Sequence, residues 1–92
     1  KNIKDCASKF YIRLSVMDQS GVLGEITTIL GKHNVSLRSV MQKGREESKD
    51  KVTIVLITHK IEESEIDSAI KEIVDLKSVM QIDNIIRIED FK

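Results

Sequence analysis

The sequence predicts an α+β sandwich in which a four-stranded antiparallel sheet carries two helices on one face. Four segments alternate apolar and polar residues, and two others repeat apolar residues at helical spacing, in the chain order βαββαβ. The two halves are similar, and each is too small to bury its own apolar face. They must therefore share one sheet, which gives the ferredoxin-like arrangement with the first and third strands in its centre.

Length and charge limit the functions that the chain can have. Its 92 residues suffice for one domain with one modest core. Its 15 basic residues balance 15 acidic ones, so no net field attracts nucleic acid or anionic lipid. The lone Cys6 cannot close an internal disulfide, and no apolar run has the length of a membrane span or a signal sequence. We therefore expect a cytoplasmic domain that binds neither nucleic acid nor membrane.

The first half of the chain is predicted to form a strand, a helix and a second strand. Alternation with a period of two runs from Phe10 to about Met17. After turn residues at 18–21, apolar residues recur at helical spacing as far as Lys32, and Asn34 is expected to end the helix in a left-handed conformation. Alternation resumes from Val35 to Lys43, where polar residues indicate a strand with one wetter face.

The second half repeats this order. The segment 52–58 is apolar at both parities, which is typical of a central strand. Ser64 lies three residues before Asp67, as in a weak capping box, and the acidic stretch there suits the solvated start of a helix. The apolar stripe of this second helix consists of Ile66, Ala69, Ile70, Ile73 and Val74.

A last strand is predicted from Val79 to Glu89, with a bulge or bend at Asp83 and Asn84. Its evenly spaced isoleucines are Ile82, Ile86 and Ile88. Met41 and Met80 are expected to fill gaps in the core.

One face and two edges of the predicted sheet lack a cover. Because both helices lie on one side, the other face stays open and bears Tyr11, Arg13 and Met17. The second and fourth strands form the edges. An uncovered face or edge of this kind favours a partner chain.

The segment Asp18 to Leu23, which reads DQSGVL, resembles the signature loop of ACT domains, D-x-P-G-V-L. It lies between the first strand and the first helix, and the order of elements from 10 to 90 is that of the ACT family. The segments FYIRLSV, NVSLRSVMQKG, IVLITHK and IIRIED are similar to the C-terminal ACT domain of homoserine dehydrogenases. Ser20 replaces the usual proline, which loosens the loop, although its hydroxyl could still cap the helix.

This resemblance implies a regulatory domain over residues 9–92, preceded by a linker, 1–8, from an upstream catalytic region. The parent enzyme would be an NAD(P)-dependent oxidoreductase whose dinucleotide-binding glycines and catalytic lysines lie upstream. The 92 residues of this chain contain no G-x-G-x-x-G motif. We therefore expect no catalytic residue, no cofactor and no enzymatic activity in this chain alone.

ACT domains pair through the edge of the second strand and bind small amino acids between chains. The resemblance therefore implies an effector site, with threonine as the expected ligand, built from Asp18, Ser20, Gly21, Val22 and Leu23 of one chain and Ser36 and Leu37 of its partner. The amides that open the first helix favour a carboxylate by roughly 0.3 to 1 kcal/mol. Asp18 could hold the ammonium group. The same loop residues also suit an ordinary strand-to-helix turn, and the apolar ones also suit a core.

Alternative functions remain open. The chain could be a dimerisation module without a ligand, or the ACT domain of another amino-acid biosynthetic enzyme. Three other functions of this fold are disfavoured because their residues are missing. An acylphosphatase would need an arginine in the first loop, and an RNA-binding domain would need aromatic residues on the third strand. A metal carrier would need a cysteine pair, whereas this chain has a single cysteine. His33 and His59 share no metal-ligand spacing with each other or with Cys6, so no metal site is expected.

Overall fold

A computed structural model describes residues 7–43 and 51–88 of the chain. Its elements are β1 (Ala7–Met17), α1 (Val22–Lys32), β2 (Leu37–Lys43), β3 (Lys51–Thr58), β4 (Ile61–Glu62), α2 (Glu63–Val74) and β5 (Val79–Ile88). Cys6, most of the predicted linker and Glu89 lie outside the described residues.

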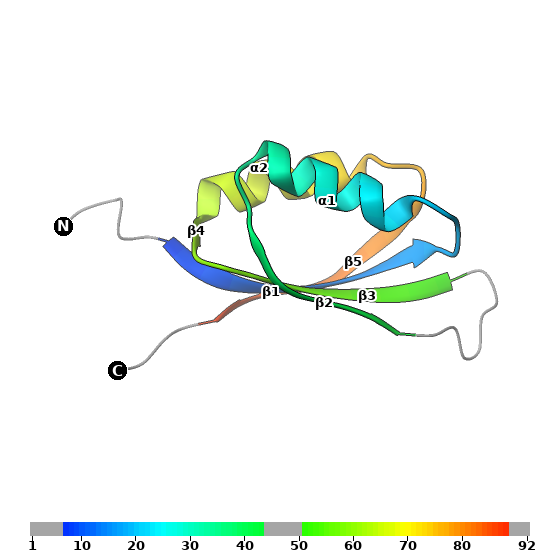
Figure 1. Cartoon of the computed structure of the whole chain (residues 1–92), viewed down its shortest axis with the longest axis horizontal. Coiled ribbons are helices and arrows are strands. Elements are labelled where there is room, and N and C mark those ends of the chain that lie inside the picture. The colour runs from blue at the N-terminus through cyan, green and yellow to red at the C-terminus, as the bar shows by residue number, and fades with distance from the viewer. Residues whose placement is uncertain (1–6, 44–50, 89–92) are drawn as a thin grey trace.

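The four long strands lie in the order β2-β3-β1-β5, and every neighbouring pair is antiparallel. The central position of β1 and β3 confirms the prediction from the sequence, as does the placement of β2 and β5 at the edges. Figure 1 shows both helices on one side of this sheet. The α+β ferredoxin-like fold is therefore confirmed.

A two-residue strand, β4, is absent from the sequence prediction. It pairs with the beginning of β1, where Ala7 lies opposite Glu62 and Ser8 opposite Ile61. Ala7 and Ser8 thus belong to β1 and not to a linker. A pairing this short leaves no periodic signal in the sequence. Between β3 and β4 the ladder is interrupted, and the backbone N–H of Phe10 donates to the Thr58 hydroxyl at 3.0 Å.

The hydrophobic core fills the space between the sheet and the helices. Alternate residues of β1 and β3 meet Val22, Ile26 and Leu30 of α1 and Ile66, Ala69 and Ile73 of α2. The predicted stripe on α2 is confirmed except at Val74, which is 46% exposed. Val74 is the last residue of the helix.

The start of α1 differs from the expectation. Gly21 is the N-cap residue, with a φ of 85°, and no side chain caps the helix. The prediction that Ser20 caps it is therefore wrong. The turn is closed by the backbone instead, because the N–H of Glu25 donates to the carbonyl of Gly21 at 3.0 Å. At the other end, Asn34 has a φ of 64°, which confirms the predicted left-handed residue.

The capping box predicted for α2 is also wrong. The helix begins at Glu63, with Glu62 as its N-cap and no side-chain cap. Ser64 lies inside the first turn, where its carbonyl accepts a hydrogen bond from the Ser68 hydroxyl at 3.1 Å. The acidic first turn is confirmed by Glu63 and Glu65.

Irregularities in the edge strands change which face some side chains occupy. In β2, Leu37 lies opposite Thr58 and Ser39 opposite Ile57, so Arg38 is an extra residue in the strand. This slip turns Met41 to the face away from the helices, where it is 50% exposed. The prediction that Met41 fills a core gap is wrong for this reason.

The predicted bulge in β5 is confirmed, because the pairing with β1 shifts register at Asp83. The shift separates the evenly spaced isoleucines: Ile82 lies opposite the buried Leu14, whereas Ile86 lies opposite Tyr11 on the other face. A second shift falls near Met80, which is 54% exposed and does not fill a core gap.

Candidate functional site

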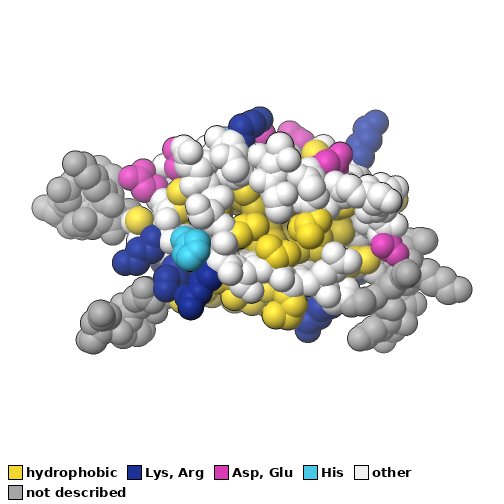
Figure 2. Space-filling model, in the orientation of Figure 1, with side chains coloured by type: hydrophobic (Ala, Val, Ile, Leu, Met, Phe, Trp, Pro, Cys, Tyr) yellow, Lys and Arg dark blue, Asp and Glu magenta, His cyan; other side chains and the backbone are white. Residues whose placement is uncertain are grey.

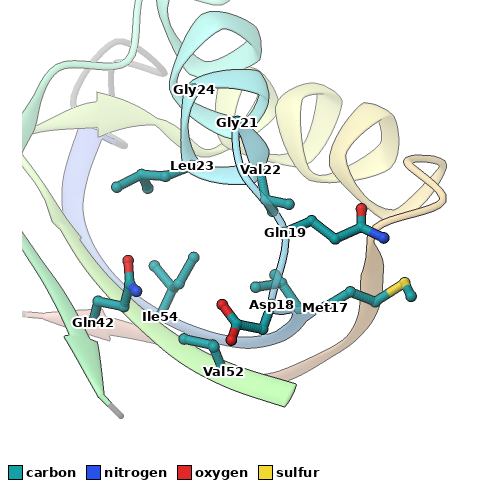
Figure 3. Close-up of a pocket in the computed structure, with 11 residues that line it drawn as sticks. Met17, Asp18, Gln19, Gly21, Val22, Leu23, Gly24, Gln42, Val52 and Ile54 are labelled. Atoms are coloured by element: carbon teal, nitrogen blue, oxygen red, sulfur yellow. The ribbon is translucent and has the colours of Figure 1, made fainter. Parts of the chain in front are cut away.

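A cavity of about 170 Å³ lies where the β1–α1 loop passes over the sheet. Its walls come from the end of β1, the loop, the first turn of α1, and the neighbouring strands β2 and β3 (Figure 3). The lining residues are Val16, Met17, Asp18, Gln19, Gly21, Val22, Leu23, Gly24, Gln42, Val52 and Ile54.

Polar groups enter this cavity from two sides of an apolar floor. Figure 3 shows Gln42 and Ile54 directed from the sheet toward Leu23, with the Asp18 carboxylate to their right. The side chains of Met17 and Gln19 point away, so these two residues contribute mainly backbone. The cavity thus combines one carboxylate, one amide and several aliphatic side chains.

The backbone at the start of α1 supplies hydrogen-bond donors at the cavity wall. No side chain caps these amides, and the positive end of the helix dipole lies at the same place. Gly21 and Gly24 have no Cβ, and a Cβ built on either meets no atom within 4 Å. A ligand carboxylate can therefore approach the helix backbone closely.

The structure brings together four of the seven predicted site residues. Asp18, Gly21, Val22 and Leu23 line the cavity. Ser20 does not, because it faces a second hollow on the other side of the loop. Ser36 and Leu37 do not line it either, and their predicted role is on the partner chain, which stays a prediction.

Gln42 is a candidate that the sequence analysis missed. It lies opposite Ile54, on the helix side of the sheet. The extra residue at Arg38 gives Gln42 this orientation, and uniform alternation from Leu37 would have turned it to the other face.

The second hollow, of about 260 Å³, separates the loop from the turn between α2 and β5. The N–H of Met17 donates to the Ser78 carbonyl at 2.8 Å across this junction. The Ser78 hydroxyl in turn donates to Oε1 of Glu25 at 3.1 Å. These bonds fasten both the end of β1 and the first turn of α1 to the same turn, so the loop between them is held at both ends.

A charged cluster joins the far end of α1 to α2. His33, the C-cap of α1, places Nε2 2.8 Å from one carboxylate oxygen of Glu72, and Lys32 places Nζ 2.9 Å from the other. Hydrogen bonds from Lys32 and then from His33 lower the pKa of Glu72 below its ordinary value. The cluster lies at the opposite end of α1 from the cavity and links α1 to α2.

The described residues offer neither a metal-binding group nor a membrane-spanning helix. Within 7–43 and 51–88 no three His, Cys, Asp or Glu side chains form a group that could hold a metal ion. In the same residues no helix is long and apolar enough to cross a membrane.

Residues 10–78 match the family model of the ACT domain. The chain is 36% identical over 77 residues to a homoserine dehydrogenase of Pseudomonas aeruginosa, and the matched region covers 84% of this chain and 18% of that protein. It is 37% identical over 81 residues to a homoserine dehydrogenase of Helicobacter pylori, and the matched region covers 88% of this chain and 19% of that protein. The chain therefore spans about a fifth of the curated relatives that it matches.

Solved structures agree with this assignment. A homoserine dehydrogenase from Thiobacillus denitrificans superposes with a TM-score of 0.82 at 31% identity, over 98% of this chain and 19% of that one. The ACT domain of a GTP pyrophosphokinase from Chlorobium tepidum has a TM-score of 0.66 at 15% identity, over 89% of this chain and 99% of that one, which shows the fold alone. The chain belongs to the ACT domain family.

Proposed function

We propose that this chain is the C-terminal regulatory domain of a homoserine dehydrogenase and that it binds a small amino acid, with threonine as the first candidate. The similarity to homoserine dehydrogenases over most of the chain supports the parent enzyme. The observation that carries the binding proposal is the cavity beside the uncapped start of α1.

Each part of an amino acid has a complementary group in this cavity. The ligand carboxylate accepts hydrogen bonds from the first amides of α1, and Asp18 pairs with the ammonium group. The ligand side chain lies toward Gln42, whose amide can bond a hydroxyl, and toward Ile54. About 170 Å³ is below the several hundred Å³ of typical drug-sized pockets, which favours a small ligand.

Subunit pairing through the β2 edges is the second part of the proposal. β2 is an edge strand, so its outer backbone groups can pair with another chain. Figure 2 shows hydrophobic side chains in a band between the helices and the sheet on the β2 side. Val40, in this edge, is 43% exposed. A partner strand at this position would cover the band and bring its Ser36 and Leu37 near the cavity.

The chemistry of the parent enzyme belongs to a part that this chain does not span. In the proposal, NAD(P) and the reacting semialdehyde bind in the upstream catalytic region, in the cytoplasm. This chain alone then gives no turnover with homoserine and a nicotinamide cofactor. Measurable turnover would overturn this part of the proposal.

Calorimetric titration of the chain with L-threonine tests binding directly. We expect saturable heat, and we expect Asp18→Asn to weaken binding about tenfold to a hundredfold, because it removes one charged hydrogen bond. Asp67→Asn, on the exposed side of α2, is the matched control and should leave binding unchanged. No heat with threonine or any other small amino acid at millimolar concentration would contradict the proposal.

A dimerisation module without a ligand is the alternative that the hydrophobic band beside β2 favours. Sedimentation distinguishes the two functions. A dimer that is insensitive to every amino acid would support the alternative. Arg38→Pro should dissociate a β2-edge dimer in either case, and it should spare the fold because Arg38 has no register partner on β3.

A further inference from the structure

The sheet face away from the helices carries apolar side chains that no described element covers. Tyr11, Ile57 and Ile86 form one row across β3, β1 and β5, since register partners point to the same side. Met41 and Val55 form the next row. Ile86 is 51% exposed and Met41 50% exposed. Val55 is buried but lies outside the main core cluster, which agrees with its place on this second face.

A basic group with an unmet hydrogen bond lies in the middle of this face. Arg13 is the register partner of Val55, and its Nε is buried without a hydrogen-bond partner among the described residues. The Asp83 carboxylate is 3.9 Å away, which is too long for a hydrogen bond. A buried donor left without an acceptor is costly. The Arg13 side chain as a whole is 44% exposed, so a carboxylate of a second chain can contact its exposed part, although not the buried Nε.

Asp83 is engaged by other groups of the same face. The Ser15 hydroxyl donates to its Oδ2 at 3.0 Å, and the Gln81 amide donates to its Oδ1 at 2.6 Å. A carboxylate has about four acceptor positions, so Asp83 can still accept hydrogen bonds from a second chain. The face therefore presents a cation and an anion side by side within an apolar surround.

We propose that this face binds a second copy of the chain, face to face across a two-fold axis, with Arg13 of each copy paired to Asp83 of the other. The two charges make the face complementary to itself, as an isologous interface requires. The apolar rows pack between the two sheets at the usual spacing of about 10 Å. A partner surface of a single charge sign would match only one of the two groups.

The size of the face sets the expected strength. Four strands about 4.8 Å apart and about seven residues long at ~3.3 Å each give an area on the order of 400 Å². Stable interfaces use about 800 Å² per partner, so the association is weak and depends on concentration. It uses a different surface from the β2 edge and does not depend on effector binding. In the parent protein it would join two edge-paired dimers.

Sedimentation equilibrium in an Arg38→Pro background tests the proposal without β2-edge pairing. We expect Arg13→Glu alone and Asp83→Lys alone to weaken self-association about tenfold or more, since each places like charges together. A mixture of the two variants should associate again, because both charge pairs are then opposite. The proposal would be overturned if the Arg38→Pro chain alone is monomeric at every concentration. It would also be overturned if the mixture of the two variants associates no more strongly than each variant alone.

A matched pair of isoleucine substitutions distinguishes association through this face from non-specific hydrophobic association. Ile85 and Ile86 are neighbours in β5 with similar exposure, 45% and 51%, but only Ile86 lies on the open face. Ile86→Lys should abolish the association and Ile85→Lys should preserve it. Equal effects of the two would contradict the proposal. This pair leaves Asp83 intact, so it decides the matter even if Asp83→Lys does not fold.

Discussion

The left-handed turn at Gly21 gives a prediction that depends on backbone conformation alone. Gly21→Ala places a Cβ on a residue with a φ of 85°, whereas Gly24→Ala places one on a residue in the first turn of α1. A Cβ at either position meets no atom within 4 Å. Neither variant creates a steric clash, so any difference between them reports the cost of the conformation.

The magnitudes follow from two opposing effects. Alanine in the left-handed region costs about 1–2 kcal/mol, and its lower entropy in the unfolded chain returns about 0.4–1 kcal/mol. Gly21→Ala should therefore destabilise the fold by about 1 kcal/mol. Gly24→Ala should stabilise it by about 0.5 kcal/mol, near the lower end of the usual range because the position lies in the first turn.

Urea unfolding and thermal unfolding, each followed by circular dichroism, measure both changes. Each kcal/mol should move the thermal midpoint by roughly 4–8 °C in a chain of this size. Equal stabilisation by both substitutions would refute the assignment of a strained turn at Gly21. Because Gly24 also lines the cavity, Gly24→Ala should weaken threonine binding while it stabilises the fold.

Three further predictions test other parts of the structure. Leu56→Ala should cost about 2–5 kcal/mol in urea unfolding, because Leu56 is fully buried, whereas the exposed Val74→Ala should change little; similar costs would contradict the placement of the core. Thr58→Val should cost about 1–3 kcal/mol, because it leaves the buried Phe10 N–H without its acceptor, and a neutral result would argue against this bond. Glu72→Gln should destabilise the fold at neutral pH only. Since the pKa of Glu72 is lowered on folding, its ionised form stabilises the fold above its ordinary value of 4.5, and this contribution disappears as the pH falls through the folded-state pKa. A difference between Glu72→Gln and the original chain that persists in strong acid would contradict the ionic cluster.

Alternation and helical spacing in the sequence were enough to predict the order and type of the long elements. The central strands follow most directly, because Ile12, Leu14 and Leu56 are buried where the period places them. The edge strands could not be predicted in the same way. Their irregular register depends on which residue is left without a partner, and local sequence carries little information about that choice. Met41 and Ile86 are on the open face for this reason.

The candidate site was predictable where it depends on the loop and not where it depends on the sheet. The motif from Asp18 to Leu23 identifies one wall of the cavity. Gln42 is 24 residues further along than Asp18, and only the strand pairing brings it there. The capping roles predicted for Ser20 and Ser64 are wrong, since the structure shows that both helices begin without side-chain caps.

Amide chemical shifts of the chain during a threonine titration test the central claim most directly. The account predicts saturable shifts concentrated at Gly21 to Gly24 and at Gln42, with much smaller shifts in α2. Shifts that are absent at millimolar threonine, or that concentrate away from the first turn of α1, would contradict an effector site in this cavity.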